Sequence, residues 1–423
     1  MRRQVLVGIV LMAGIAGCEI VSGLSDLEFG EGGAGAAGGS GPGAGGQGGD
    51  GPGGGGAQGG AGGSGGQGGT GVGGEGGMGG GPVTTEALFN AQSRYTCAPR
   101  GGEVYCWGQT PNFGPYELSP QVIPFPADTV QPLGDDAYCA RNGAGELRCW
   151  GGSNADGQLG TGDTSSVPTP GPLVVLPGPA LSYFLKNDAG CAVVETSPRR
   201  AYCWGNNDYA VISFPADAAP HPTPEVVSLP GPVGDIDQVE IGLNFACARR
   251  GTEVFCWGHN QQGKLGIGTN DYLEHPPTAI ATTNQVKHLA LRGEGGCIMS
   301  VDDEAFCWGS PFSSDGQLVP VPFLDGATGL EGGDAHVCGI KNGDVVCAGY
   351  NSHLELGAPS AFSYEGMVTI PGGAASVVAG YWMTCALSVP GEVYCWGYNF
   401  AGALGIGSAD ESSFSQPQLV TLP

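Results

Sequence analysis

A short cysteine-bounded unit recurs seven times in this chain of 423 residues. Its clearest copy runs from Cys385 to Gly397 and ends in Cys-Trp-Gly. The other copies lie at Cys97–Gly108, Cys139–Gly151, Cys191–Gly205, Cys247–Gly258, Cys297–Gly309 and Cys338–Gly349. Their second cysteines are 40 to 54 residues apart, and the copy at Cys347 reads Cys-Ala-Gly. Such a period indicates a repeat protein in which each repeat is one supersecondary unit.

Two further counts agree on seven repeats. A Pro-bounded apolar stretch follows each unit, at Val122–Phe125, Leu173–Leu176, Val226–Leu229, Ala279–Ala281, Val319–Phe323, Met367–Ile370 and Leu419–Leu422. The chain has 15 cysteines, and setting Cys18 aside leaves seven pairs. The repeats therefore extend from about Thr84 to Pro423.

Each unit predicts a β-hairpin with its two cysteines face to face. Asn342-Gly343 is a strong signal for a type I′ turn, which needs positive φ at both central residues. Counting outward from that turn places Cys338 opposite Cys347 on a non-hydrogen-bonded pair, where side chains approach most closely. The same alignment predicts seven disulfides, Cys97–Cys106, Cys139–Cys149, Cys191–Cys203, Cys247–Cys256, Cys297–Cys307, Cys338–Cys347 and Cys385–Cys395.

The alternatives for the cysteine pairs are zinc ligation and a redox role. Zinc is disfavoured because no Cys-x-x-Cys occurs, the pairs are separate in sequence and the six histidines are scattered. Seven disulfides would require an oxidising compartment.

The residues around each second cysteine predict a strand buried on both sides. In Val104–Trp107, Val and Cys share one face of the strand while Tyr and Trp share the other. Both faces are apolar, which suits a strand packed between neighbouring blades of a propeller. We therefore expect the repeated tryptophans and glycines to be core and turn residues.

The unit resembles the repeat of the regulator of chromosome condensation family, in which Cys-Trp-Gly leads into Gly-x-Asn-x-x-Gly-Gln-Leu-Gly-x-Gly. The best copies are Gly151–Gly162, Gly258–Gly268 and Gly397–Gly407, and those after Cys106 and Cys203 are degenerate. The resemblance covers roughly residues 84–423. It implies an all-β, seven-bladed β-propeller with about four antiparallel strands per blade. The founding member acts on a nuclear GTPase at chromatin, and that role does not transfer to an exported acidic chain.

The first residues predict an exported lipoprotein. Arg2 and Arg3 precede an apolar run from Val5 to Ile15, which is the plan of a secretory signal. The run ends in Ile15-Ala-Gly-Cys18, which resembles a bacterial lipobox, so residues 1–17 are the expected signal peptide and Cys18 the lipid attachment site. An ordinary signal with a chance cysteine is the alternative. Glu19 instead of Asp is compatible with sorting to the outer membrane, where acyl chains tether a protein without spanning the bilayer.

Residues 18–83 are expected to be a disordered tether behind the anchor. Between Gly30 and Gly81, 33 of 52 residues are glycine, which leaves too little apolar surface to offset the entropy of ordering. Treated as a flexible coil, this stretch reaches roughly 40 Å.

Composition argues against several functions. With 15 Lys plus Arg against 40 Asp plus Glu, the formal net charge of −25 argues against nucleic-acid binding. The acidity either keeps the protein soluble or attracts basic partners. No nucleophile elbow, zinc-protease motif or phosphate loop occurs, so we expect neither an enzyme nor a cofactor. Asp156 and Asp163 raise the alternative of calcium, but a metal site is not expected.

A protein-binding surface is the favoured function. Loops after the Cys-Trp-Gly strands should emerge on one face of the propeller, and they carry Phe113, Tyr116, Tyr209, Phe312, Tyr350, Tyr398 and Phe400. Aromatic side chains are enriched at protein interfaces. The alternatives are that these aromatics pack locally, that the propeller inhibits a secreted hydrolase, or that it binds a carbohydrate or another polymer. The sequence leaves the partner unidentified and leaves open whether the two ends of the repeat region share one blade.

Overall fold

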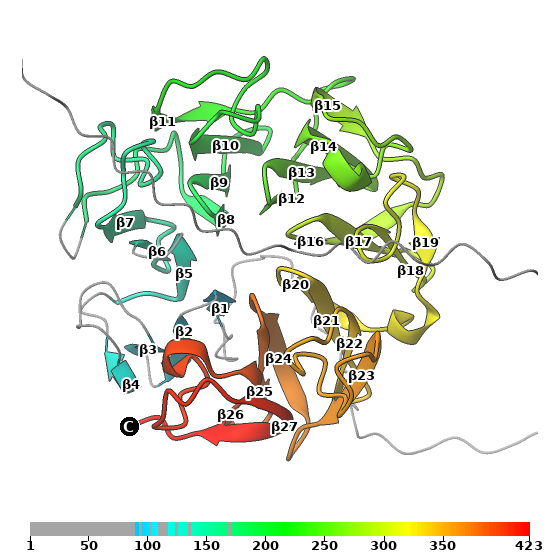
Figure 1. Ribbon diagram of the computed structural model, residues 1–423. Coiled ribbons are helices and arrows are strands. Elements are labelled where there is room, and N and C mark those ends of the chain that lie inside the picture. Colours follow the sequence, from blue (N-terminus) through cyan, green and yellow to red (C-terminus); the bar gives the residue numbers. More distant parts are fainter. Residues whose placement is uncertain are drawn as a thin grey trace, which may run out of the picture. The chain divides into compact units, whose positions relative to one another are not determined.

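The computed structural model describes residues 89–92, 95–100, 103–108, 117–122, 126–133, 137–167 and 171–423. These residues form seven antiparallel sheets that stand as blades around a common centre (Figure 1). Six sheets have four strands and one has three, which confirms the predicted seven-bladed β-propeller. The expected signal peptide, Cys18 and the glycine-rich tether lie outside the described residues.

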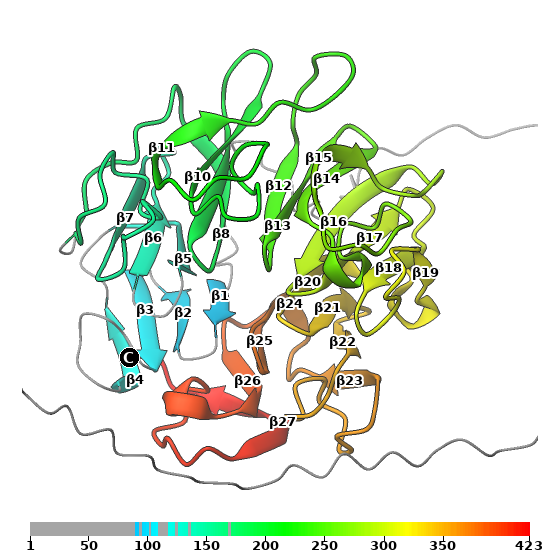
Figure 2. The ribbon, with the colours of Figure 1, turned by 45° about the horizontal axis from the view of Figure 1, so that its top comes forward.

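The first strand of each blade lies nearest the centre (Figures 1 and 2). These strands are β1 (Phe89–Gln92), β5 (Thr129–Leu133), β8 (Ala180–Lys186), β12 (Gln238–Gly242), β16 (Val286–Arg292), β20 (Thr328–Gly332) and β24 (Ala374–Ala379). The second strand of each blade carries the first cysteine of the repeat. These strands are β2 (Tyr95–Arg100), β6 (Ala137–Arg141), β9 (Ala189–Val194), β13 (Phe245–Arg250), β17 (Gly295–Ser300), β21 (His336–Lys341) and β25 (Met383–Ser388).

The third strand of each blade carries the second cysteine. These strands are β3 (Glu103–Gly108), β7 (Leu147–Gly151), β10 (Arg200–Gly205), β14 (Glu253–His259), β18 (Ala305–Gly309), β22 (Asp344–Gly349) and β26 (Val393–Tyr398). The outer strands are β4 (Glu117–Val122), β11 (His221–Val226), β15 (Glu274–Ala279), β19 (Val319–Pro320), β23 (Glu365–Thr369) and β27 (Ser413–Val420). Three short 3₁₀ turns are also described, η1 (Gln261–Gly263), η2 (Pro322–Leu324) and η3 (Phe400–Gly402).

Blade 2 lacks a continuous outer strand among its described residues. Single bridges join Gly151 to Val167 and Arg148 to Leu173, so the stretch Leu173–Leu176 only partly replaces the strand. Gly171 lies so close to β7 that an added Cβ would be 1.8 Å from the carbonyl oxygen of Cys149. The Arg148 guanidinium donates to the Gly171 carbonyl over 2.9 Å, which holds the segment against the blade.

All seven hairpins have the register expected from their turns. Each first cysteine lies directly opposite its second cysteine, and the seven pairs form disulfides. Their Cα atoms are 4.0 to 4.1 Å apart, the close spacing of non-hydrogen-bonded pairs. Every one of these cysteines is fully buried.

The hydrophobic core consists of seven clusters, one at each blade junction. At the junction of blades 6 and 7, the Cys338–Cys347 disulfide and Leu356 of blade 6 pack with Tyr394 and Trp396 of blade 7. Blade 6 has Ala348 where the other blades have tryptophan. At its junction with blade 5, Leu324 is buried in the cluster and the half-buried rings of Phe312 and Phe323 pack against it.

The ring closes by side-chain contacts between blades 7 and 1. β1 pairs with β2, and β27 pairs with β26, so each terminal strand belongs to its own blade. Across the junction, the Trp107 indole donates to the Ala403 carbonyl over 2.9 Å, and the Thr96 hydroxyl donates to the same oxygen over 3.0 Å. Arg100 Nη1 donates to the Leu422 carbonyl over 2.7 Å.

Candidate binding face

Five loops that follow third strands are folded by one buried asparagine each. The asparagine Oδ1 accepts a hydrogen bond from the backbone N–H five residues later, as Asn399 does from Leu404 over 3.2 Å. The same bond joins Asn154 to Leu159, Asn207 to Ile212, Asn260 to Leu265 and Asn351 to Leu356. The amide also bonds the far side of the loop, as Asn399 Nδ2 donates to the Ser408 carbonyl over 2.9 Å.

Each asparagine loop is held against the next blade by a tryptophan. The indole N–H of Trp396 donates to the carbonyl of Glu355, four residues after Asn351 in the preceding blade, over 3.0 Å. Trp204, Trp257, Trp308 and Trp107 bond the corresponding carbonyls of Gln158, Val211, Lys264 and Ala403. These tryptophans are at most 2% exposed, so they are core residues as expected.

The asparagine loops share one face of the propeller with the loops that join innermost and second strands. The backbone N–H of Tyr398 donates to Trp382 O over 2.9 Å, and His259 bonds Asn244 in the same way. Tyr350 and Asn206 make the corresponding bonds to Ala335 and Asp188. We call this surface the loop face.

The structure places the seven predicted binding residues unequally. Phe113 and Tyr116 lie outside the described residues. Phe312 is half-buried beneath the guanidinium of Arg292, whose Cζ is 4.9 Å from the ring centroid, and so follows the alternative of local packing. Tyr350 is 42% exposed, and its hydroxyl is 3.3 Å from the Ser310 hydroxyl.

Tyr398 lies at the junction of blades 6 and 7, and Phe400 stacks on it. Their rings are stacked with centroids 5.9 Å apart and an interplanar angle of 15°. Trp382 meets Tyr398 edge-on at 5.7 Å, and His353 of blade 6 stacks on Trp382 at 4.5 Å. Tyr381 meets Trp382 at 4.3 Å. We call these five residues the aromatic cluster.

Sequence reasoning missed Trp382 and Tyr381 because it considered only the loops after third strands for aromatics. His353 does lie in such a loop, but it was interpreted as a surface or turn residue. Trp382 could have been noticed in the sequence, because it is the one tryptophan of the seven that does not directly follow a second cysteine. It lies in the tripeptide Gly380–Trp382 between an innermost and a second strand, a loop that shares the loop face.

A smaller aromatic group lies at the junction of blades 3 and 4. The ring centroid of Tyr209 is 5.3 Å from that of His259, and the centroid of Tyr272 is 6.4 Å from it. Tyr209 follows its loop asparagine by two residues, as His353 does, and His259 corresponds to Tyr398. The two junctions therefore repeat the same arrangement with different side chains.

Glu355 is fully buried at the junction beside the aromatic cluster. Its Oε2 accepts the backbone N–H of His353 over 2.7 Å, whereas Oε1 has no hydrogen-bond partner among the described residues. Burial raises the pKa of the Glu355 carboxyl to about 7.

A histidine and a threonine fix the backbone at Glu355. The Thr384 hydroxyl donates its proton to the Glu355 carbonyl over 2.8 Å, so His336 Nε2, 2.9 Å from Thr384 Oγ1, must carry the hydrogen of their shared bond. Burial, with the positive charges of Arg292 and Lys186 adding to it, lowers the pKa of His336 to about 3. The imidazole is therefore neutral at pH 7.

Buried charged residues of the innermost strands form hydrogen bonds with backbone groups of the propeller. Arg292 Nη2 donates to Trp308 O over 2.8 Å, and Nη1 donates to Ser310 O over 2.6 Å. Glu240 accepts the Leu291 N–H of the next blade over 2.6 Å, and burial raises its pKa well above the usual range. Each group bonds the backbone it supports, so we assign none of them a chemical role.

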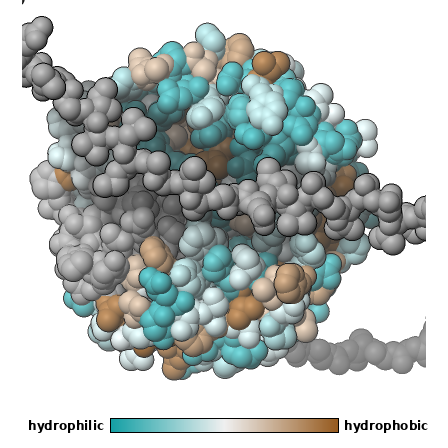
Figure 3. Space-filling model, in the orientation of Figure 1, coloured by the Kyte–Doolittle hydropathy of each residue, from teal (hydrophilic) through white to brown (hydrophobic). Residues whose placement is uncertain are grey.

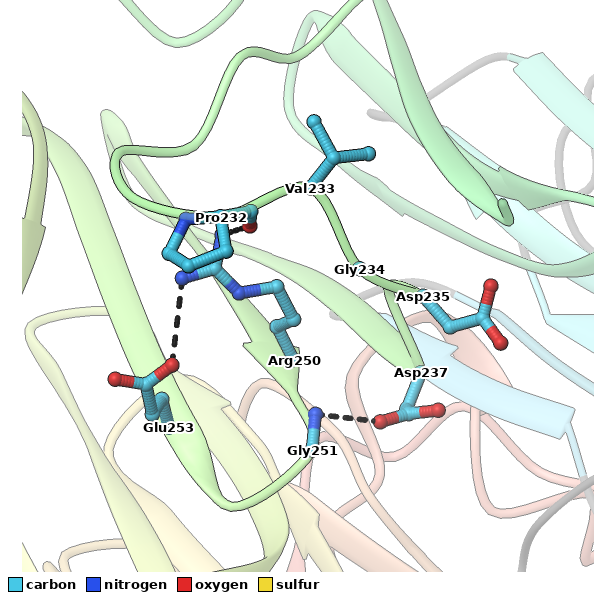
Figure 4. Close-up of a pocket in the computed structure, with 8 residues that line it drawn as sticks. All are labelled: Pro232, Val233, Gly234, Asp235, Asp237, Arg250, Gly251 and Glu253. Carbon is cyan, nitrogen blue, oxygen red and sulfur yellow. Dashed lines mark hydrogen bonds and ion pairs between the residues drawn. The ribbon is translucent and has the colours of Figure 1, made fainter. Parts of the chain in front are cut away.

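A depression of about 440 Å³ lies near the strand turns of blade 4 (Figure 4). Its charged groups are paired: Arg250 bonds Glu253 and the carbonyls of Pro230 and Pro232, while Asp237 accepts the Gly251 N–H. Asp237 also lies 2.6 Å from Arg199. The charged groups in this depression thus bond one another or neighbouring backbone atoms.

The described part of the chain offers neither a metal-binding cluster nor a membrane-spanning helix. No three His, Cys, Asp or Glu side chains gather there in a way that could hold a metal ion. None of its helices has the length and apolar character needed to cross a bilayer. On the face seen in Figure 3, hydrophobic residues form small separate groups among hydrophilic ones.

Comparison with known proteins gives consistent matches. A family model described as the regulator of chromosome condensation (RCC1) repeat matches residues 374–403, from β24 into the loop after β26. The E3 ubiquitin-protein ligase HERC2 of Homo sapiens is 25% identical over 351 residues, which cover 75% of this chain and 7% of that protein. The ultraviolet-B receptor UVR8 of Arabidopsis thaliana is 25% identical over 63% of this chain and 64% of the receptor. The chain thus spans less than two thirds of either relative.

Solved structures share the fold. Yeast RCC1 (Prp20), in a crystal structure with Kap60 bound to it, has a TM-score of 0.63 at 17% identity over 78% of this chain and 85% of that chain. Human WBSCR16 has a TM-score of 0.63 at 19% identity over 73% and 86% of the two chains. At these identities the likeness concerns the fold alone.

Proposed function

We propose that the propeller, in which residues 374–403 match the regulator of chromosome condensation (RCC1) repeat, is a non-enzymatic scaffold that binds a protein partner through the loop face. The observation that carries the proposal is the aromatic cluster, where Tyr398 and Phe400 lie with three further rings. Clustered aromatics at the centre of an interface supply much of its binding energy. Yeast RCC1 (Prp20), which shares the fold, has been solved with Kap60 bound to it.

The test is photo-crosslinking of the full-length protein in its own cells, followed by mass spectrometry of the captured partner. Alanine substitutions at Tyr398 and Phe400 should reduce the yield of that partner by about tenfold, the effect of removing hot-spot side chains. Alanine at Val233, which is 69% exposed in the blade 4 depression, is the matched control and should leave the yield unchanged. Equal capture of the partner by the wild-type protein, by the Tyr398 and Phe400 variant and by the Val233 variant would contradict the proposal.

We further propose that the scaffold is an exported lipoprotein held at the outer membrane by acyl chains on Cys18. The support is the charged, apolar and lipobox-like order of residues 1–18. Metabolic labelling with a fatty acid should mark the wild-type protein, and Cys18→Ala should remove the label. Labelling that persists in the variant would disprove the anchor.

A further inference from the structure

Side chains at two positions face each other across blade junctions. The first position lies four residues after the loop asparagine, and the second lies three residues before the first cysteine of the next blade. In blade 2 the first position is Gln158, whose Nε2 donates to Asp188 Oδ1 over 3.3 Å. In blade 4 it is Lys264, whose Nζ is 2.6 Å from Glu294 Oε2. In both pairs a donor on the loop meets an acid on the next blade.

At the junction of blades 6 and 7 the chemistry of the two positions is changed. The first position is Glu355, an acceptor, and the second is Trp382, which replaces the acid. Glu355 is fully buried and its Oε1 has no donor among the described residues. Leaving a buried acceptor unpaired costs free energy, so a donor brought to this junction would recover it.

The rings beside Glu355 suit a cation. His353 stacks on Trp382 at 4.5 Å and lies 4.9 Å from Tyr398, so three rings converge on one junction. His353 does not oppose a cation, because burial lowers its pKa and keeps it neutral at pH 7. Ring faces attract ammonium groups, most strongly for tryptophan and where water is partly excluded.

We propose that this junction binds the ammonium group of a lysine side chain presented by the protein partner, with Glu355 as counter-ion and Trp382, Tyr398 and His353 as the surrounding rings. The inference rests on the proposed function for the existence of that partner and specifies what the loop face recognises. The formal net charge of −25 would also attract a partner rich in basic residues such as lysine.

The probe is N-acetyl-lysine methylamide, titrated into the full-length protein by calorimetry. Its norleucine counterpart, which lacks the amine, is the neutral control. We expect saturable binding of the lysine probe and affinity at least about tenfold weaker for the norleucine compound, as expected for loss of a cation–π contact and a counter-ion. Choline forms a third arm that distinguishes a lysine from a free quaternary amine.

Glu355→Gln and Trp382→Ala should each weaken binding of the lysine probe by about tenfold. Glutamine is accommodated at this position in blade 2, where Gln158 is buried, so Glu355→Gln keeps the junction folded. Tyr209→Ala is the matched control, because that junction has the same ring arrangement with Val211 in place of Glu355. It should bind the probe as the wild type does.

Equal affinity for the lysine and norleucine probes, or unchanged affinity in Glu355→Gln, would overturn the inference. Binding of choline without binding of the lysine probe would also overturn it, in favour of a small quaternary amine. If the lysine probe fails while crosslinking of the partner still depends on Tyr398, this inference falls and the proposed scaffold function stands.

Discussion

The tryptophan at the end of a third strand has two roles at its blade junction. Trp396 packs in the core between blades 6 and 7, and its indole N–H donates a hydrogen bond to the Glu355 carbonyl of the preceding blade. Leu356 and the Cys338–Cys347 disulfide pack in the same cluster, so removing the ring affects both blades.

Trp396→Ala should therefore destabilise the propeller by about 3–5 kcal/mol, the usual cost of deleting a buried aromatic ring. Equilibrium unfolding in urea measures the change. Trp382→Ala is the control for loss of an indole, and it should cost less than about 1 kcal/mol because Trp382 is only half-buried and lies outside the core cluster of this junction. Equal losses in the two variants would mean that the junction core does not carry the stability assigned to it.

Glu355 gives a pH-dependent contribution to stability. Its carboxyl has a pKa of about 7 in the folded protein and an ordinary value of 4.5, so the folded state binds the proton more tightly. Stability from this group is fully present below about pH 4.5 and is lost as pH rises through 7. Glu355→Gln should thus stabilise the protein by up to about 3 kcal/mol at pH 8 and very little at pH 4.5. Urea unfolding at both pH values tests this, and a gain independent of pH would contradict it.

At the scale of the element, the hairpin is the best-predicted part of the protein. Turn dipeptides such as Asn342-Gly343 fix the register locally, so the position of Cys338 opposite Cys347 followed from a short stretch of sequence. The outer strands were less predictable because their partners follow long loops. β19 has only two residues, and in blade 2 the expected strand is reduced to bridges at Val167 and Leu173.

The candidate site was predicted only in part, because some of its contacts join residues that are far apart in the sequence. Tyr398 and Phe400 lie in a recognisable repeat loop, so their face could be inferred. Their contacts with Trp382 and His353 come from two blades and depend on the blade junction, which no local pattern describes. The buried position of Glu355 likewise depends on tertiary packing.

The disulfide of one hairpin can be removed as a test at this scale. Replacing both Cys385 and Cys395 by alanine should cost about 2–3 kcal/mol, because the bond closes a short loop in the unfolded chain. The double variant should still fold with the same hairpin register. Mass spectrometry of the unreduced wild-type protein should recover the Cys385–Cys395 linkage, and finding free thiols in the denatured unreduced protein would refute the pairing.

At the scale of the whole molecule, the first and last described strands, β1 and β27, each pair within their own blade. Blades 7 and 1 meet through Trp107, Thr96 and Ala403, which repeats contacts found at internal junctions. Trp396 and Thr384 make the same pair of bonds to the Glu355 carbonyl. The closing junction is therefore equivalent to the others in its main contacts.

Circular permutation should follow from this equivalence. New ends between Pro232 and Val233, with Pro423 linked to Phe89 by a flexible peptide, should give a folded propeller within about 1–2 kcal/mol of the unpermuted domain, because the cut lies in an exposed connection. New ends between Gly402 and Ala403 should cost more, because they separate Asn399 from the Leu404 N–H that it caps. Urea unfolding compares the two, and equal stabilities would show that the asparagine loop is dispensable.

The bond that five of the tryptophans after second cysteines make to the preceding loop gives the ring a direction. Each asparagine loop receives its hydrogen bond from the tryptophan of the blade that follows it. The segment that has to be duplicated or deleted as a whole therefore begins at an asparagine loop and ends at the next Cys-Trp-Gly. Blade 6 illustrates the rule, since Ala348 stands in place of the tryptophan and the loop of blade 5 that it would have met has Ser310-Pro311 instead of the asparagine. Gain or loss of a repeat in such a chain would therefore be tolerated best when its boundaries fall inside blades and leave each loop with its own tryptophan.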